Sequence, residues 1–301
     1  MTLSLPTGSV RLVAIAIAVW IVQPFSAGVV IGEALGDATE PFRTSVSVAA
    51  WIAWLVILLA IAVPRPATLT IARVGTAGGL IGTLWAAWDV EANHTDTGAT
   101  TLTIGLAASI AAVATINLPG VADRFLDGVS YGDERRFALR VPGPVLVVAL
   151  IPSVLIVIAG LSAGPLLLAD ERWVGGAIVA VVGFGVAWFP LNALHRLTKR
   201  FLVFVPNGLV VHDPTQLREP ALFVKREIAG LAPAPADTTA KDITAAALGL
   251  ALELRFATAT ELSFVSGRTT TDNETVRSVL VAPTRPTAVM AAALERGLTI
   301  A

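Results

Sequence analysis

Six long apolar stretches, none containing an acidic residue, constrain this chain more than any other feature of its sequence. They run over residues 10–31, 46–63, 69–88, 100–117, 145–167 and 173–193. Arg73 is the only basic residue that lies more than two residues inside one of them. Because a helix crosses a bilayer with about 20 apolar residues, we predict an α-helical membrane bundle of six transmembrane helices.

The composition supports a membrane location and excludes several classes of protein. Of the 301 residues, 55% are hydrophobic and 14% are charged, whereas a soluble domain carries about 25% charged residues. A soluble monomer is therefore excluded. The net charge of −1 argues against nucleic acid as a partner, because binding phosphates requires a basic surface. The absence of cysteine excludes disulfides and thiol chemistry.

The first and fifth stretches contain features that allow two interpretations. Gln23–Pro24 and Pro152 indicate either kinks that neighbouring helices support or helix breaks around a polar site; we favour kinks. The first stretch follows Arg11 as a signal peptide would, but it is longer than such a segment and no clear cleavage site closes it. We predict a retained helix, whereas cleavage would leave five spans.

The distribution of basic residues predicts the orientation. One set of loops and ends holds Arg11, Arg65, Arg73, Arg124, Arg135, Arg136 and Arg140, whereas the other holds Arg43 and Arg172 with most of the acidic residues. Tryptophans gather toward the second side, at Trp51, Trp54, Trp85, Trp88 and Trp173. We predict a multi-pass protein of the cytoplasmic (inner) membrane with both termini in the cytoplasm.

The sequence changes character after His195. Residues 196–301 contain 12 bases and 10 acids, and short Val-, Leu- and Phe-rich segments predict strands over 201–205, 209–212, 221–224, 227–231, 248–257, 261–266 and 277–282. Asn207–Gly208 predicts a tight turn with positive φ angles, and Pro286 starts a helix to about 296. We predict two domains, a transmembrane domain over 1–195 and a cytoplasmic β domain over 196–301 that forms a small antiparallel barrel or sandwich with a C-terminal helix.

Three segments resemble bacterial pleckstrin-homology-like (PH-like) domains: RFLVFVPNGLVVH at 200–212, KREIAGL at 225–231 and VAPTRP at 281–286. With SYGDERRF at 130–137 and FVPNGLVVHDP at 204–214, the whole chain resembles uncharacterised actinobacterial integral membrane proteins. The PH-like resemblance implies lipid or protein binding at a membrane. It implies no enzymatic activity.

Few residues suggest catalysis or metal binding. His94, His195 and His212 fall in different segments, and Asp89, Glu91, His94 and Asp96 are better explained as a solvated acidic loop than as a cation site. Adjacent residues on a strand point to opposite faces, which argues against a His212–Asp213 catalytic pair. Walker, nucleophile-elbow and zinc-protease motifs are absent. We predict no enzyme, no metal and no cofactor.

The loop over 118–144 carries the densest mixture of charges in the chain. Its bases either dock a lipid headgroup or protein partner, or only fix the topology. We predict a membrane adaptor or assembly protein whose PH-like domain binds a protein partner or inner-leaflet lipid, with Arg135, Arg136, Lys225 and Arg226 as contact residues. The alternatives are a small-molecule transporter or channel, and a membrane enzyme with a polar cluster near Gln23, Asn117 or Asn192.

Overall fold

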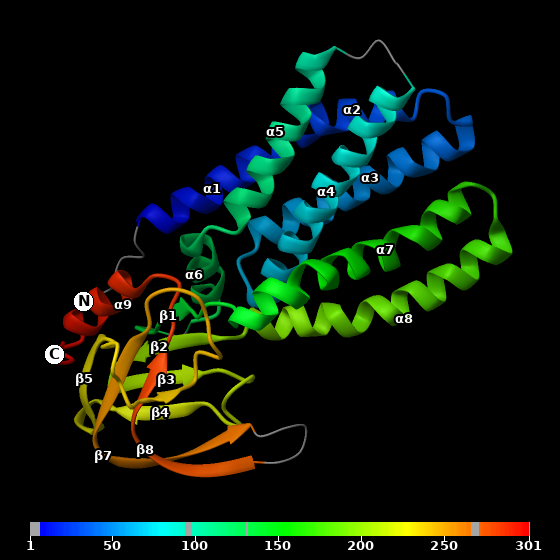
Figure 1. The fold of residues 1–301 in the computed structure, drawn as a ribbon. Coiled ribbons are helices and arrows are strands. Elements are labelled where there is room, and N and C mark those ends of the chain that lie inside the picture. The colour runs from blue at the N-terminus through cyan, green and yellow to red at the C-terminus, as the bar shows by residue number, and fades with distance from the viewer. Residues whose placement is uncertain (1–6, 94–97, 131, 266–270, 301) are drawn as a thin grey trace. The chain divides into compact units, whose positions relative to one another are not determined.

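The computed structural model describes residues 7–93, 98–130, 132–265 and 271–300 (Figure 1). The chain forms two compact units, each assembled from separate stretches of sequence. We call Leu5–Val121 with Pro152–Leu194 the helical unit, and Ala122–Ile151 with His195–Ala301 the β unit. The sequence predicted a single boundary, at residue 195, whereas the two units alternate along the chain.

The helical unit confirms the apolar helices that indicate a membrane protein. Among the described residues, five helical stretches are long and apolar enough to cross a bilayer: Gly8–Ala34, Glu40–Ala62, Ala99–Ile116, Val145–Ala169 and Trp173–Leu197. Its elements are α1 (Thr7–Ile21), the short 3-10 helix η1 (Gln23–Phe25), α2 (Ala27–Ala34), α3 (Glu40–Ala62), α4 (Pro66–Ala92), α5 (Ala99–Ile116), α7 (Leu150–Ala169) and α8 (Trp173–Leu197). A five-residue π-helical turn, η2 (Val145–Ala149), precedes α7.

Helix α4 is the predicted span that does not satisfy the criterion of length and apolarity. It is 27 residues long, but Arg73 and several glycines and threonines lower its hydropathy. The glycines have a packing role, because a Cβ at each would contact a different helix: Gly75 meets Ile57 of α3, Gly78 meets Ile158 of α7, Gly79 meets Trp20 of α1 and Gly82 meets Ile31 of α2. Helix α4 thus packs against four other helices, and the face that does so needs less apolar surface than a lipid-facing helix.

Helices α7 and α8 form a hairpin joined through small residues (Figure 1). A Cβ on Gly160 would lie 2.5 Å from the oxygen of Gly183, and one on Gly164 would lie 2.3 Å from the Cα of Ala180. Small residues let helix backbones approach closely in lipid. The outer surface of the hairpin carries large exposed apolar side chains, for example Val181 and Phe189.

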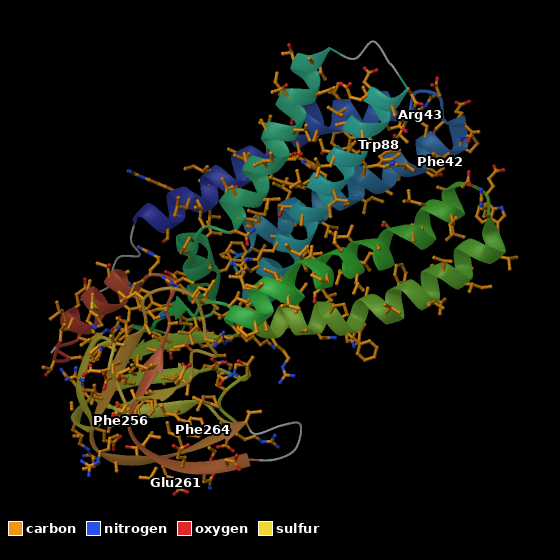
Figure 2. All side chains as sticks on the ribbon, in the orientation of Figure 1. Phe42, Arg43, Trp88, Phe256, Glu261 and Phe264 are labelled. Atoms are coloured by element: carbon orange, nitrogen blue, oxygen red, sulfur yellow. The ribbon has the colours of Figure 1, made fainter. Side chains whose placement is uncertain are left out.

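The tryptophans were predicted to gather toward one end of the transmembrane helices. Two labelled side chains of the structure lie at that end. Arg43 near the start of α3 and Trp88 near the end of α4 lie at the same end of the helical unit (Figure 2). Trp88 is 68% exposed.

In the β unit, Phe256 and Phe264 both belong to a single long strand (Figure 2).

The β unit contains two four-stranded sheets with strand orders β1-β2-β3-β4 and β5-β7-β8-β6. The first contains β1 (Arg135–Ala138), β2 (Phe201–Val205), β3 (Gly208–His212) and β4 (Ala221–Val224); the second contains β5 (Ile228–Pro233), β6 (Lys241–Asp242), β7 (Leu252–Val265) and β8 (Thr271–Val281). Helices α6 (Pro119–Asp127) and α9 (Pro286–Glu295) and the 3-10 helix η3 (Lys225–Glu227) complete it. All strand pairs are antiparallel except β6 with β8.

Three features of the sheets differ from the sequence prediction. Strand β1 lies in the segment interpreted as a charged loop. Strand β7 is continuous where two strands were predicted, and a register shift between Arg255 and Thr260 marks the bulge at the predicted break. The β2–β3 turn consists of Pro206 and Asn207. It therefore lies one residue earlier than the predicted Asn207–Gly208 turn, and neither Asn207 nor Gly208 has a positive φ angle.

One hydrophobic core joins the two sheets and α9. Alternate residues of β2 and β3, such as Leu202, Phe204 and Leu209, point into it together with Leu254 of β7 and Val289 of α9. Gly208 is required by close approach, since a Cβ there would lie 2.1 Å from the oxygen of Phe223. This alternation of buried and exposed residues determines which face of the first sheet packs against the hydrophobic core.

Candidate functional site

The predicted contact residues Arg135 and Arg136 are adjacent on β1 and therefore point to opposite faces of its sheet. Arg135 pairs with Glu295 of α9 at 3.5 Å, and its guanidinium lies 5.1 Å from the Phe137 ring centroid. Arg136 pairs with Glu134 at 3.1 Å. Both arginines thus have acidic partners within the β unit, which leaves less of their charge for a ligand.

Lys225 and Arg226, the other two predicted contact residues, lie on η3 between β4 and β5. Both are exposed, and no ion pair joins either of them to another described residue. The Lys225 ammonium lies beside Gly297, where an added Cβ would be 2.9 Å from Nζ. That position is at the C-terminal end of α9, where a positive charge is favourable. Arg226 is the least constrained of the four.

An apolar side chain shortly precedes these two bases in the sequence. Leu222 lies on β4, the edge strand of the first sheet, and is 58% exposed. The carboxylate of Glu227 accepts a hydrogen bond from the main-chain N–H of Val224 at 3.2 Å. This bond occupies part of the free edge, so side chains rather than main-chain groups are the main contacts offered here. We call Leu222, Lys225 and Arg226 the edge patch.

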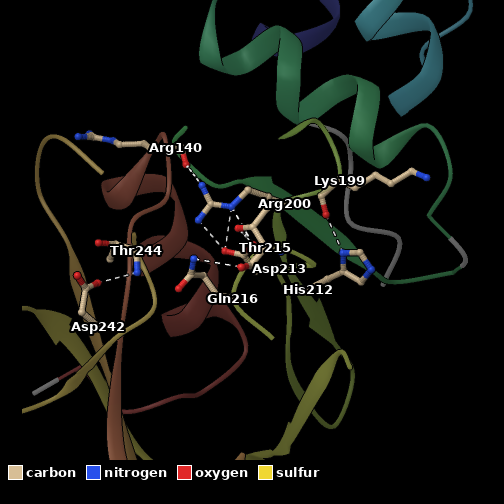
Figure 3. Close-up of polar contacts among 9 residues, drawn as sticks. All are labelled: Arg140, Lys199, Arg200, His212, Asp213, Thr215, Gln216, Asp242 and Thr244. Atoms are coloured by element: carbon tan, nitrogen blue, oxygen red, sulfur yellow. Dashed lines mark hydrogen bonds and ion pairs between the residues drawn. The ribbon is translucent and has the colours of Figure 1, made fainter. Parts of the chain in front are cut away.

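A buried ion pair lies at the other end of the same sheet (Figure 3). Arg200 Nε donates to both oxygens of Asp213 at 2.9 Å, and Nη2 donates to Oδ2 at 2.6 Å. Arg200 Nη1 donates to the main-chain oxygen of Arg140 at 2.6 Å, and Asp213 also accepts from the N–H and hydroxyl of Thr215. The side chains of the pair are 1% and 0% exposed. The network joins the ends of β1, β2 and β3, and its role is structural.

His212 and the adjacent Asp213 contact different groups. The Nδ1 of His212 is 2.7 Å from the main-chain oxygen of Lys199 (Figure 3), and the His212 ring stacks on Phe201 at 4.6 Å between centroids. Sequence reasoning did not identify Arg200 as the partner of Asp213, because their 13-residue separation becomes a contact only when β2 pairs with β3.

Two carboxylates of α6 satisfy the outer edge of β1. Asp123 Oδ1 accepts from the N–H of Ala138 at 2.9 Å, and Asp127 Oδ1 accepts from the N–H of Arg136 at 2.7 Å. The spacing matches because four residues of helix advance about 6 Å and two residues of strand about 6.6 Å. Helix α6 thereby closes an edge that would otherwise be open to pairing.

Burial perturbs both of these carboxylates. It raises the pKa of Asp123 to about 6, although the hydrogen bond from Ala138 and the charge of Arg285, 3.2 Å away, oppose the shift. It also raises the pKa of Asp127, against the hydrogen bond from Arg136. Sequence reasoning placed both acids in a charged loop, and only their burial distinguishes them from its other charges.

A polar cluster lies at the break between α1 and α2 in the helical unit. Gln23 is buried, and its Nε2 donates to the main-chain oxygens of Ala108 at 2.9 Å and Val19 at 3.3 Å. Ser109 Oγ is 2.9 Å from Thr83 Oγ1 and 3.4 Å from Gln23 Oε1. The break is thus a distinct 3-10 turn held by α4 and α5 rather than the simple kink we favoured.

The other candidate polar residues do not join this cluster. Asn117 and Asn192 each donate to a main-chain oxygen four residues earlier, Val113 and Trp188. Within the described residues no group of three or more His, Asp or Glu side chains is arranged to hold a metal ion. His94 and Asp96 of the predicted acidic loop lie outside the described residues. Comparison with protein-family models, curated proteins and solved structures finds no match to this chain.

Proposed function

We propose that this chain is an integral membrane adaptor or assembly protein whose PH-like β unit recruits a protein partner. The observation that carries the proposal is the edge patch, in which an exposed leucine lies on an edge strand beside bases that no described carboxylate neutralises. Interaction surfaces combine apolar side chains with charges that complement those of the partner. The complementary partner is a protein segment with apolar and acidic side chains.

The proposal includes a topology with six spans. Helix α4 is long enough to cross the bilayer, and its central packing accounts for its lower apolarity. The bias of basic residues toward one set of loops places the β unit and both termini in the cytoplasm, at the inner membrane.

The connection between the units supports an anchoring role for the helices. The α7–α8 hairpin is inserted between β1 and β2, which are paired over Arg135–Ala138 and Phe201–Phe204. Short segments join each strand to the hairpin, residues 139–144 on one side and 198–200 on the other. The hairpin is therefore joined to the β unit by two chain segments, one from each of two paired strands.

The edge patch and the chain connections to the α7–α8 hairpin lie at opposite ends of the first sheet. The chain passes to α7 and α8 at the end of the sheet that contains Ala138 and Phe201, whereas Lys225 follows the opposite end, next to the β2–β3 turn. Five strand residues separate the two ends, which corresponds to about 13 Å. The patch therefore lies at the end of the first sheet opposite to the strand ends from which the chain continues into α7 and α8.

Site-specific photocrosslinking in intact cells tests this function. A photoreactive residue at Leu222 is expected to crosslink a protein, and Arg226→Glu combined with Lys225→Glu is expected to abolish the product by reversing the charge. Leu248 is the matched control, because it is 61% exposed in the same unit but remote in sequence from the patch. Equal crosslinking at both positions, insensitivity to charge reversal, or products containing only lipid would contradict the proposal.

Transport remains a second candidate because of the polar cluster at Gln23. Broken helices with buried polar groups form the binding sites of several transporter folds. However, both amide protons of Gln23 are taken by main-chain oxygens, which favours a structural role. Solute flux into liposomes that is abolished by Gln23→Leu, in a protein that remains folded, would favour transport over recruitment.

A further inference from the structure

Arg73 is a partly buried charge in the helical unit with no counter-ion among the described residues. It lies on α4, beside the buried residues Leu69 and Thr76, and its Nε is buried without a hydrogen-bond partner. Within the described part of the chain, no ion pair or side-chain hydrogen bond involves its guanidinium. This is unusual, because charged side chains within membrane-spanning helices are costly and normally have a partner.

The acidic residues of the helical unit cannot supply the counter-ion. All the described ones lie at or near the opposite ends of the helices: Glu33, Asp37, Glu40, Asp89, Glu91, Asp170 and Glu171. Asp89, the nearest along α4, follows Arg73 by sixteen residues, or about 24 Å of helix. At the end where α4 begins, the charges of this unit are the bases Arg11, Arg65 and Arg73.

The depth of Arg73 defines which anion can reach it. It follows Pro66, the first residue of α4, by seven residues, or about 10 Å of helix rise. A long arginine side chain can extend over most of that distance toward the headgroup region. The guanidinium fork matches a phosphate with two parallel hydrogen bonds, and an anionic phospholipid presents at this level a phosphate whose charge no choline group neutralises.

We propose that Arg73 is a phosphate-binding site at the end of the helical unit where α4 begins. The phosphate belongs either to an anionic phospholipid headgroup or to a free anion, and both would supply the charge that the protein does not. The site depends only on contacts within the helical unit, so it is independent of the partner proposed for the edge patch.

Thermal unfolding of the full-length protein in nanodiscs tests the site. Three conditions are compared: phosphatidylcholine alone, phosphatidylcholine with phosphatidylglycerol, and phosphatidylcholine with inorganic phosphate. Stabilisation by phosphatidylglycerol alone identifies a lipid headgroup, whereas stabilisation by phosphate identifies a free anion. If neither anion stabilises the wild-type protein, the proposal is wrong.

Variants then assign the effect to Arg73. Arg73→Gln is expected to weaken the apparent affinity for the stabilising anion about tenfold or more, as expected for loss of a charge-assisted hydrogen bond. Arg65→Gln is the matched control, because Arg65 is exposed at the N-cap of the same helix. Arg73→Lys retains the positive charge but lacks the two parallel N–H donors of the guanidinium. It replaces Arg73→Gln in the comparison if the glutamine variant does not fold. Equal affinity in wild type and all three variants would overturn the assignment.

Discussion

Trp20 of α1 and Trp54 of α3 exchange a reciprocal pair of hydrogen bonds, in which each indole Nε1 donates to the main-chain oxygen of the other residue at 3.0 Å. Pro24 has no N–H, so the oxygen of Trp20, four residues earlier, cannot accept its usual helical hydrogen bond. Trp54 supplies the missing donor. Within a bilayer, where water is absent, such compensation is what allows a helix to break.

Trp54→Phe should therefore destabilise the helical unit. The phenyl ring retains most of the apolar contact but leaves the oxygen of Trp20 without a donor, which costs about 1–3 kcal/mol. Unfolding in mixed detergent micelles measures the loss. Trp51→Phe is the control, because Trp51 contacts the Trp54 ring edge-to-face and is exposed. A comparable loss in both variants would show that ring packing, not the hydrogen bond, is responsible.

Gly183→Leu should separate the α7–α8 hairpin. A side chain there would overlap the oxygen of Gly160, 2.5 Å from the new Cβ, and overpacking of this kind costs about 1–3 kcal/mol or more. Gly185→Leu adds the same side chain to the same helix, where nothing lies within 4 Å, and should be tolerated. Crosslinking between cysteines introduced in α7 and α8 reports the separation, and equal efficiency in both variants would contradict it.

Asp213→Ala should destabilise the β unit strongly. Removing one member of a buried ion pair leaves the other charge uncompensated, which costs about 3–5 kcal/mol. The double variant Arg200→Met with Asp213→Leu replaces the pair by apolar groups and should recover much of that loss. Hydrogen exchange of β2 and β3 amides measures both. Additive losses in the double variant would mean that the two charges do not act as a pair.

Asp123 should make the stability of the β unit depend on pH. Its pKa is raised to about 6, above its value in an unfolded chain, so the folded state binds the proton more tightly. The resulting stabilisation is present below pH 4 and is lost as the pH rises through 6, a difference of about 3 kcal/mol. Unfolding of the wild type between pH 4 and 7 should follow this direction.

Asp123→Asn separates the charge from the hydrogen bond. The amide oxygen can still accept from the N–H of Ala138, while the buried charge is removed, so the variant should lose this part of the pH dependence and be at least as stable as the wild type at pH 7. Asp123→Ala removes the acceptor and should be less stable at every pH. An unchanged pH profile in Asp123→Asn would show that another group titrates.

Several elements could be predicted because their signals are local. The strands over 201–205 and 221–224 have the bounds predicted from their apolar residues, and the last helix begins at Pro286 as predicted. Strand β1 could not be found in this way. Its four residues, RRFA, are half charged, and they form a strand because β2, more than sixty residues later, and the carboxylates of α6 satisfy both of its edges.

The candidate site, too, could be predicted only in part from the sequence. The sequence identified Arg135, Arg136, Lys225 and Arg226 equally as bases, and only the fold gives the first two the acidic partners Glu295 and Glu134. Leu222 was one apolar residue of a predicted strand, and its exposure follows from the place of β4 at the edge of a sheet. Sequence patterns do not reveal which strand is the edge.

By itself, the sequence determined that the chain contains apolar helices suited to a bilayer and a separate set of strands, because hydrophobic length and periodicity are local properties of the chain. The tertiary structure alone decided that α4 packs against four other helices of the helical unit and that a segment between helices completes the first sheet. It also decided which charges remain uncompensated: Arg73 and Arg226 lack acidic partners among the described residues, whereas Arg200 has one. Pairing depends on contacts between residues far apart in sequence, and only folding brings those together.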